Sequence, residues 1–237
     1  MIEVLISDMK IAYTHLELPE GKIKYQDKRL NALADKDNPK KVTPFFVEFI
    51  GDDFIQADVI VLPTENVLDL LILDMDMIEN RLSRVEEDGE KVVLEKAMSF
   101  LENEIPLCDC DFSEEEMKLL KVSRPLSLKP VVKMESAKDI NDMISDVLEK
   151  AGMMFFYTSG PKESHAWLVE KNSDIITCAG KIHSDLARGF IKGDIVEFDD
   201  YMSAHNFNDC RSKGFVKVVD RDFIVPDGSV IEIRFNV

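Results

Sequence analysis

The spacing of apolar and polar positions changes along the chain, and the change separates strand-like from helix-like segments. Four short apolar runs, at residues 2–6, 21–25, 45–50 and 58–62, have the length of strands. The last two are almost continuously apolar, which is typical of strands covered on both faces. From residue 67 onward apolar side chains instead recur every third or fourth position, so the sequence predicts helices after the strands.

Two amphipathic helices are predicted within about residues 66–105. Their apolar stripes are Val67, Leu71, Met75, Ile78, Leu82 and Val85, then Val93, Leu94, Ala97, Met98, Leu101 and Ile105. Asp88 and Gly89 are a turn signal between them, so we expect an antiparallel helical hairpin. Its outward positions are predicted to be acidic, at Asp69, Asp76, Glu79, Glu86, Glu87, Glu90, Glu95 and Glu102. The simpler interpretation is a solvated face, and the alternative is an acidic surface that recognises a partner.

Local signals after the hairpin predict a further helix, a strand and a domain boundary. Ser113 and Glu116 have the spacing of a capping box. Residues 128–134 predict a strand, and Ser136 or Asp139 is expected to cap the helix that follows. Gly152 should end that helix, and we therefore predict two domains, residues 1–151 and 152–237.

The second predicted domain contains alternating strand patterns and one short helix. The helix is expected within residues 179–192 and leads into a strand. Pro226, Asp227 and Gly228 predict a turn, and after it Val230, Glu232 and Arg234 alternate with Ile231, Ile233 and Phe235. This alternation predicts a terminal strand with two different faces.

Composition limits the class of protein. With 237 residues and 45% hydrophobic side chains, the chain has enough apolar material for one large or two small cores. Four cysteines at this length favour a reducing cytoplasm over a disulfide framework. The amino-terminal residues have neither the basic region of a signal peptide nor a membrane-spanning apolar run, so no membrane partner is expected.

Net charge is −17 and is distributed unevenly. Residues 1–151 hold 33 acidic and 19 basic side chains, whereas residues 152–237 hold 13 and 10. The first part should be repelled by phosphate backbones, which argues against DNA binding and against a general nucleic-acid binder. The second part is close to neutral and remains compatible with a local contact to RNA.

Several phrases of the sequence resemble the Obg-like ATPase (YchF) family, most specifically its C-terminal TGS domain. The matching phrases are residues 154–160, 164–167 and 179–190, in the order and spacing of that family. The sequence departs from it in two places: Lys192-Gly193-Asp194 stands where Arg-Ala-Glu is usual, and Ser229 stands where an acidic residue is usual. Residues 27–34, 44–50, 54–60 and 127–130 resemble the nucleotide-binding half of the family more weakly, but in register.

The resemblance implies an α/β fold. We expect a reduced P-loop-GTPase-like α/β layer with an inserted helical hairpin, followed by a ubiquitin-like β-grasp TGS domain. The family association implies a role at ribosomes, on structured RNA or with a regulatory ligand.

The chemistry of the family's nucleotide-binding half is missing from the sequence. A P-loop requires G-x-x-x-x-G-K-[ST], yet residues 7–13 follow the first predicted strand and no glycine precedes Gly21. Residues 51–54 replace the metal-binding Asp-x-x-Gly, and residues 133–135 replace the base-reading Asn-x-x-Glu. We therefore predict a pseudo-GTPase that is not an enzyme, with no nucleotide or metal cofactor. The alternatives are residual ATPase or GTPase activity, and a structural protein that docks a protein partner through the acidic hairpin.

Candidate contact residues for RNA or another ligand lie in residues 152–237. They are Lys181, His183, Arg188, Lys192, Lys213, Lys217 and Arg221. The simpler interpretation is ordinary surface charge, and for His183 a capping or packing role. Cys108 and Cys110 supply only two of the four clustered ligands that a structural zinc site needs, so no metal site is predicted.

Overall fold

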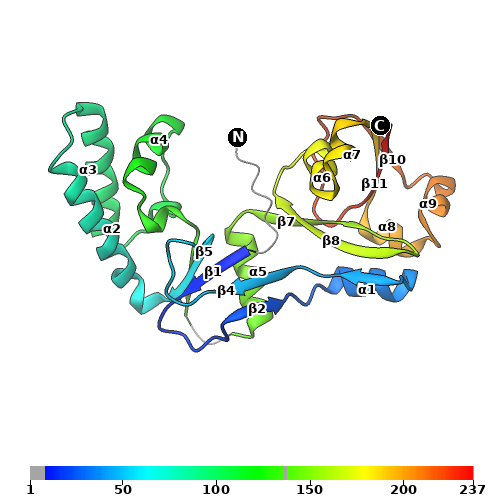
Figure 1. Ribbon diagram of the computed structural model, residues 1–237, viewed down its shortest axis with the longest axis horizontal. Coiled ribbons are helices and arrows are strands. Elements are labelled where there is room, and N and C mark those ends of the chain that lie inside the picture. Colours follow the sequence, from blue (N-terminus) through cyan, green and yellow to red (C-terminus); the bar gives the residue numbers. More distant parts are fainter. Residues whose placement is uncertain (1–8, 136–137, 237) are drawn as a thin grey trace. The chain divides into compact units, whose positions relative to one another are not determined.

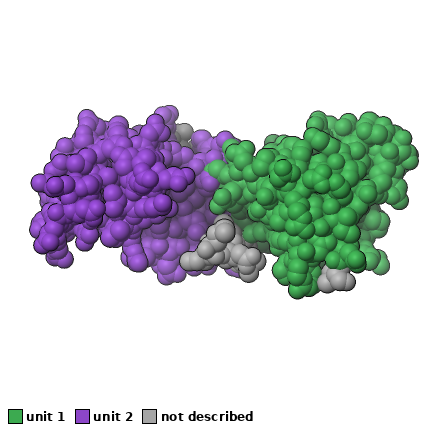
Figure 2. Space-filling model, turned by 90° about the horizontal axis from the view of Figure 1, so that it is seen from above, with its two compact units in different colours: residues 1–8, 24–46, 152–237 green, residues 9–23, 47–151 purple. Residues whose placement is uncertain are grey.

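The computed structural model describes residues 9–135 and 138–236, and these form two compact units (Figures 1 and 2). Of the described residues, unit 1 contains 24–46 and 152–236, and unit 2 contains 9–23 and 47–151. The strand predicted at residues 2–6 lies outside the described residues. Residues 24–46 thus group with the C-terminal residues, although the sequence analysis assigned them to the first domain.

Unit 2 is built on a five-stranded sheet with a parallel centre. Its strand order is β2 (Gly21–Lys24), β4 (Phe46–Phe49), β1 (Met9–Tyr13), β5 (Val59–Pro63) and β6 (Val131–Met134). The central strand β1 runs parallel to β4 and β5, and β5 runs parallel to β6. Every residue of β5 is buried, as its continuous apolar sequence predicts for a strand covered on both faces. The carboxyl ends of these parallel strands share one edge of the sheet.

The helices of unit 2 largely follow the predicted pattern. They are α2 (Val67–Leu82), α3 (Asp88–Glu102), α4 (Glu114–Ser123) and α5 (Ile140–Lys150), with 3-10 turns η1 (Thr64–Asn66), η2 (Leu107–Asp109) and η3 (Leu126–Leu128). The α2–α3 hairpin is confirmed, but Asp88 and Gly89 form the first turn of α3 rather than the loop before it. The capping box at the start of α4 is confirmed by both of its hydrogen bonds. Asp139 caps α5, and Gly152 follows the helix with a φ of 66°.

The helical hairpin and the sheet of unit 2 share one hydrophobic core. Ile60 and Leu62 of β5 are fully buried there, together with Leu71 and Ile78 of α2. One position on the predicted acidic outer face of the hairpin is wrong, because Glu90 is buried. Arg81 donates to both of its carboxylate oxygens, at 2.6 and 2.9 Å. The pairing holds the pKa of the Glu90 carboxyl below its usual value and joins the end of α2 to the start of α3.

Unit 1 is built on a six-stranded mixed sheet. Its order is β10 (Lys217–Val219), β9 (Phe190–Val196), β11 (Val230–Phe235), β7 (Met153–Thr158), β8 (Glu163–Glu170) and β3 (Lys41–Thr43). The predicted terminal strand is confirmed as β11, which runs antiparallel to β9 and parallel to β7. The edge strand β3, more than 100 residues before β8 in the sequence, runs parallel to it.

Helices cover both faces of the unit 1 sheet. They are α1 (Lys28–Asp37), α6 (Ile175–Ile182), α7 (Ser184–Arg188), α8 (Phe198–Ser203) and α9 (Phe207–Lys213). A Cβ at Gly193 would lie 2.7 Å from Ile175, so that face of β9 packs on α6. On the other face, the Tyr157 hydroxyl donates to Asp27, the N-cap of α1, at 2.7 Å. Figure 1 shows α6 and α7 on the opposite side of the sheet from α1. The single helix predicted within residues 179–192 is two helices, which join at His183, and the last predicted residues belong to β9.

Candidate binding sites

The first candidate site is the carboxyl edge of the unit 2 sheet, where parallel α/β sheets usually bind ligands. The central strand β1 ends at Tyr13, and residues 14–20 lead directly to β2 without a helix. This changes one detail of the sequence analysis. Residues 9–13 form β1 itself, whereas the sequence analysis placed residues 7–13 after the first strand. The segment after β1 is 14–20, which contains no glycine.

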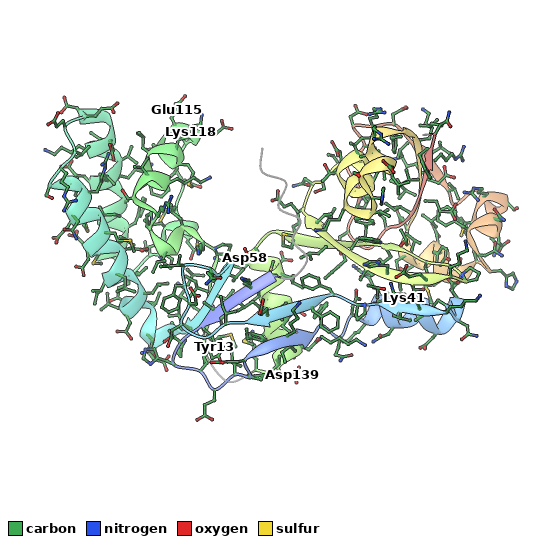
Figure 3. The ribbon with its side chains drawn as sticks, in the orientation of Figure 1. Tyr13, Lys41, Asp58, Glu115, Lys118 and Asp139 are labelled. Carbon is green, nitrogen blue, oxygen red and sulfur yellow. The ribbon has the colours of Figure 1, made fainter. Side chains whose placement is uncertain are left out.

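A hydrogen bond holds the segment after β1, residues 14–20, against the end of that strand. The Tyr13 hydroxyl donates to the Leu18 carbonyl at 2.9 Å, and the Tyr13 N–H donates to the Gly51 carbonyl at 2.9 Å. Burial, together with the carboxylates of Glu20 and Asp52, raises the pKa of the Tyr13 phenol. Figure 3 places Tyr13 at this edge and Asp58 at the opposite end of the strands. The edge therefore carries a hydrogen-bonded connecting segment and two nearby carboxylates, and this negative charge disfavours a bound phosphate.

The connection from β4 to β5, residues 50–58, is also short and anchored. The Lys129 ammonium donates to the carbonyls of Phe54 and Ile55, at 2.6 and 2.7 Å. Burial lowers the pKa of Lys129, and nearby Asp58 and Asp53 partly oppose this effect. Lys129 thus anchors the turn between β4 and β5. The family resemblance places the metal-binding Asp-x-x-Gly motif in this turn.

The second candidate site consists of the seven predicted contact residues, all in unit 1. The structure distributes them over both faces of its sheet. Lys181, His183 and Arg188 belong to α6 and α7. Lys217 lies on the same side as these helices, because its cross-strand partner Ile195 belongs to the core beneath α6. Arg221 lies beside Phe190, which also belongs to that core.

The other two predicted cations are separated from this group. Side chains alternate along a strand, so Lys192 points to the face opposite that of Gly193. Lys213 ends α9, whose Arg211 contacts that same opposite face through Asp194. The structure therefore brings five of the seven residues to one side and leaves two on the other.

Most of the seven residues already have local partners. Arg188 pairs with Asp185 at 2.7 Å, Lys213 pairs with Asp209 at 2.9 Å, and Lys192 pairs with Asp220. Lys217 lies 4.2 Å from the ring centre of Phe223, and Arg221 donates to the Phe190 carbonyl at 3.0 Å. The His183 Nδ1 accepts from the Asp185 N–H at 3.1 Å, the predicted capping role, and burial lowers the pKa of Lys181.

The sequence analysis missed a charged cluster centred on Asp194. This side chain is fully buried, and its Oδ2 accepts from Arg211 at 2.9 Å and from Arg234 at 2.8 Å. Its Oδ1 has no hydrogen-bond partner among the described residues. The one available signal was the departure from the family pattern at residues 192–194. The structure shows its physical consequence, since Gly193 makes room for Ile175 and Asp194 anchors two arginines.

The cysteines do not form a reactive or metal-binding centre within the described chain. Burial raises the pKa of the Cys108 thiol to about 11, so it stays protonated at neutral pH. Among the described residues, no three His, Cys, Asp or Glu side chains are grouped so as to hold a metal ion. Over the same residues, no helix is long and apolar enough to cross a bilayer.

Comparison with known proteins relates the chain to proteins of one family. Residues 153–236 match the family model YchF-GTPase_C, described as "Protein of unknown function (DUF933)". The chain is 24% identical to the ribosome-binding ATPase YchF of Bacillus subtilis over 325 aligned positions, covering 92% of this chain and 89% of that protein. It is 35% identical to the Obg-like ATPase 1 of Rattus norvegicus over 82 residues, or 35% of this chain and 21% of the relative.

The fold comparison agrees with the predicted class. The YchF GTPase of Schizosaccharomyces pombe superposes with a TM-score of 0.78 at 15% identity, covering 96% of this chain and 98% of that one. The α/β fold, with a parallel sheet and a second mixed sheet, is thereby confirmed. The 325 positions aligned with the Bacillus protein outnumber the 237 residues of this chain, so that protein has segments with no counterpart here.

Proposed function

The chain belongs to the YchF/Obg-like ATPase family, and on this premise we propose that it acts by binding and does not hydrolyse a nucleotide. The observation that carries the proposal is the direct connection of residues 14–20 from the central strand β1 to β2. A P-loop nucleotidase needs a glycine-rich loop and a helix N-terminus there, because backbone N–H groups have to converge on the phosphates. In this chain the Tyr13 hydroxyl instead donates a hydrogen bond to the Leu18 carbonyl at that place.

The electrostatics of this edge support the same conclusion. Glu20 and Asp52 lie close enough to Tyr13 to raise the pKa of its phenol. Carboxylates at this position oppose a triphosphate, which normally depends on a lysine and a divalent cation for charge compensation. The proposal is therefore a pseudo-GTPase whose former nucleotide edge carries a short hydrogen-bonded connection and two carboxylates in place of a phosphate-binding loop.

Isothermal titration calorimetry with ATP and GTP in the presence of magnesium tests this proposal. We expect no heat of binding up to millimolar nucleotide, whereas the Bacillus subtilis YchF, whose name describes an ATPase, serves as the positive control. Micromolar affinity would refute the loss of nucleotide binding, and steady phosphate release from the purified chain would establish the alternative of a residual nucleotidase.

For the binding activity, we propose that the unit 1 surface around α6 and α7 contacts the ribosome or another structured RNA. Relatives are named ribosome-binding ATPases, which supplies the class of partner. Five of the seven candidate residues share this side of the sheet. Residues 1–151 are strongly acidic and should repel a phosphate backbone. The contact would use a few cations, so its affinity should depend on salt.

Charge reversal on the two faces of the unit 1 sheet distinguishes this contact from general surface charge. The double variant R188E/K217E alters the α6 side, and K192E/K213E is the matched control on the other side. We expect only R188E/K217E to weaken co-sedimentation with ribosomes and to reduce the slope of log affinity against log salt by roughly 1–2. Equal losses in both variants would indicate general charge, and no co-sedimentation of the parent chain would refute the RNA contact.

A further inference from the structure

The exposed side of α2 has an apolar surface that the hairpin core does not use. We define the α2 outer face as Leu68, Asp69, Ile72, Leu73 and Asp76. Its three apolar side chains are 38%, 45% and 42% exposed, in sequence order. The residues that α2 contributes to the core are different and are buried, among them Val67, Leu70, Leu71 and Ile78.

The residues of the α2 outer face are neighbours on the helix surface. Leu68 and Ile72 are four residues apart, as are Asp69 and Leu73, and Asp76 follows Ile72 by four and Leu73 by three. At 100° per residue, the two aspartates fall between Leu68 and Ile72 on one side and Leu73 on the other. Single exposed apolar residues are common, but here three of them share one helix face with two carboxylates, so the face combines apolar contact area with negative charge.

The charges on this face determine which occupant fits. Asp76 has no cationic partner among the described residues, and Asp69 has only Asn66 at 3.0 Å and His15 at 3.3 Å. A phosphate backbone or an anionic lipid surface would be repelled by these carboxylates. A second copy of the chain would place the same aspartates against one another, at a net charge of −17 for each copy.

We propose that the α2 outer face docks a lysine- or arginine-rich amphipathic segment of another protein. Apolar side chains of that segment would pack on Leu68, Ile72 and Leu73, and its cations would pair with Asp69 and Asp76. In this arrangement the apolar side chains supply affinity and the charges supply orientation. The surface belongs to unit 2, so the proposal is independent of the RNA contact proposed for unit 1.

The test uses two synthetic 18-residue peptides of equal charge, one of leucine and lysine at helical spacing and one of serine and lysine. Binding to the full chain is measured by fluorescence anisotropy, and amide chemical shifts map the contact. We expect the leucine peptide to bind more tightly and to shift the amides of residues 68–76. The double variant I72S/L73S should lose at least about tenfold in affinity for it, since two apolar anchors are removed.

The matched control is V92S, which removes another exposed apolar side chain, 64% exposed, from the neighbouring helix α3. Its affinity should stay within about twofold of the parent, and circular dichroism should show both variants folded. Equal binding of the two peptides, an equal loss in V92S, or shifts spread over the whole acidic surface would overturn the proposal. Concentration-dependent dimers that disappear in I72S/L73S would assign the face to a second copy and would overturn it as well.

Discussion

At the scale of single residues, Gly228 meets two constraints at once. It has a φ of 82° in the turn before β11, and a Cβ there would lie 2.9 Å from the Arg29 guanidinium. That guanidinium is held in place by Asp227 at 2.7 Å. We predict that Gly228→Ala lowers the free energy of unfolding by about 1–3 kcal/mol, because alanine disfavours this φ and displaces Arg29. Urea denaturation measures the change. Gly160→Ala, at a position with open space, is the control and should have a much smaller effect.

The titration of His165 should affect stability at acidic pH. Its ring stacks on Trp167 with 3.5 Å between ring centres, and burial lowers its pKa to about 4. In the unfolded chain its pKa is about 6.5, so below that pH the unfolded state takes up a proton that the folded state does not accept. Stability contributed by the neutral ring is therefore present above pH 6.5 and is lost as the pH falls toward 4.

The variant His165→Phe tests this pH dependence, because it keeps an aromatic ring beside Trp167 without a titrating group. Relative to the parent, the loss of unfolding free energy between pH 7 and pH 5 should be smaller by about 2 kcal/mol. Denaturant unfolding at both pH values gives the difference. An identical pH dependence in His165→Phe and the parent would show that this histidine does not titrate between the two states.

At the scale of elements, one buried carboxylate connects three of them. Asp194 on β9 holds Arg211 of α9 and Arg234 of β11 through a single oxygen. We predict that Asp194→Asn lowers the unfolding free energy by about 3 kcal/mol, because two arginines lose their shared counter-charge. Glu232→Gln is the control, since Glu232 contacts the same Arg211 but is 46% exposed, and it should cost less than about 1 kcal/mol. Equal effects of the two substitutions would contradict a special role for the buried charge.

The elements that were predicted correctly are those specified by local sequence. The capping box at Ser113, the apolar stripe of α2 and the turn before β11 all depend on residues a few positions apart. The Asp194 cluster is different, because its partners are 17 and 40 residues away and charged residues are common on any surface. No local pattern indicates which of many charges is buried. The candidate contact residues could be identified from the sequence by their charge. Their division between the two faces of the sheet follows from strand register, which the sequence does not specify locally.

At the scale of the whole molecule, the grouping of residues 24–46 is the feature least accessible to sequence analysis. The strand β3 within this segment pairs with β8, and α1 presents Asp27 and Asp37 to the other half of unit 1. These contacts span more than 100 residues of chain, so they leave no periodic signal. A domain boundary predicted from composition and helix ends therefore falls at residue 151. Unit 1 nevertheless includes residues 24–46, which precede that boundary.

The two-domain interpretation of the sequence predicts that residues 152–237 fold alone, and the structure indicates what that fragment would lose. In that fragment the hydroxyls of Tyr157 and Tyr201, both nearly fully buried, lose their acceptors Asp27 and Asp37. We predict that the fragment folds with dispersed amide resonances but with a reduced melting temperature, because each lost buried hydrogen bond costs about 1–3 kcal/mol.

A synthetic peptide of residues 24–46, added in trans, should raise that temperature by restoring β3 and α1. The same peptide with Asp27 and Asp37 changed to alanine should stabilise the fragment less. No dispersed spectrum with or without the peptide would refute independent folding, and no shift on adding the peptide would separate residues 24–46 from the folding unit.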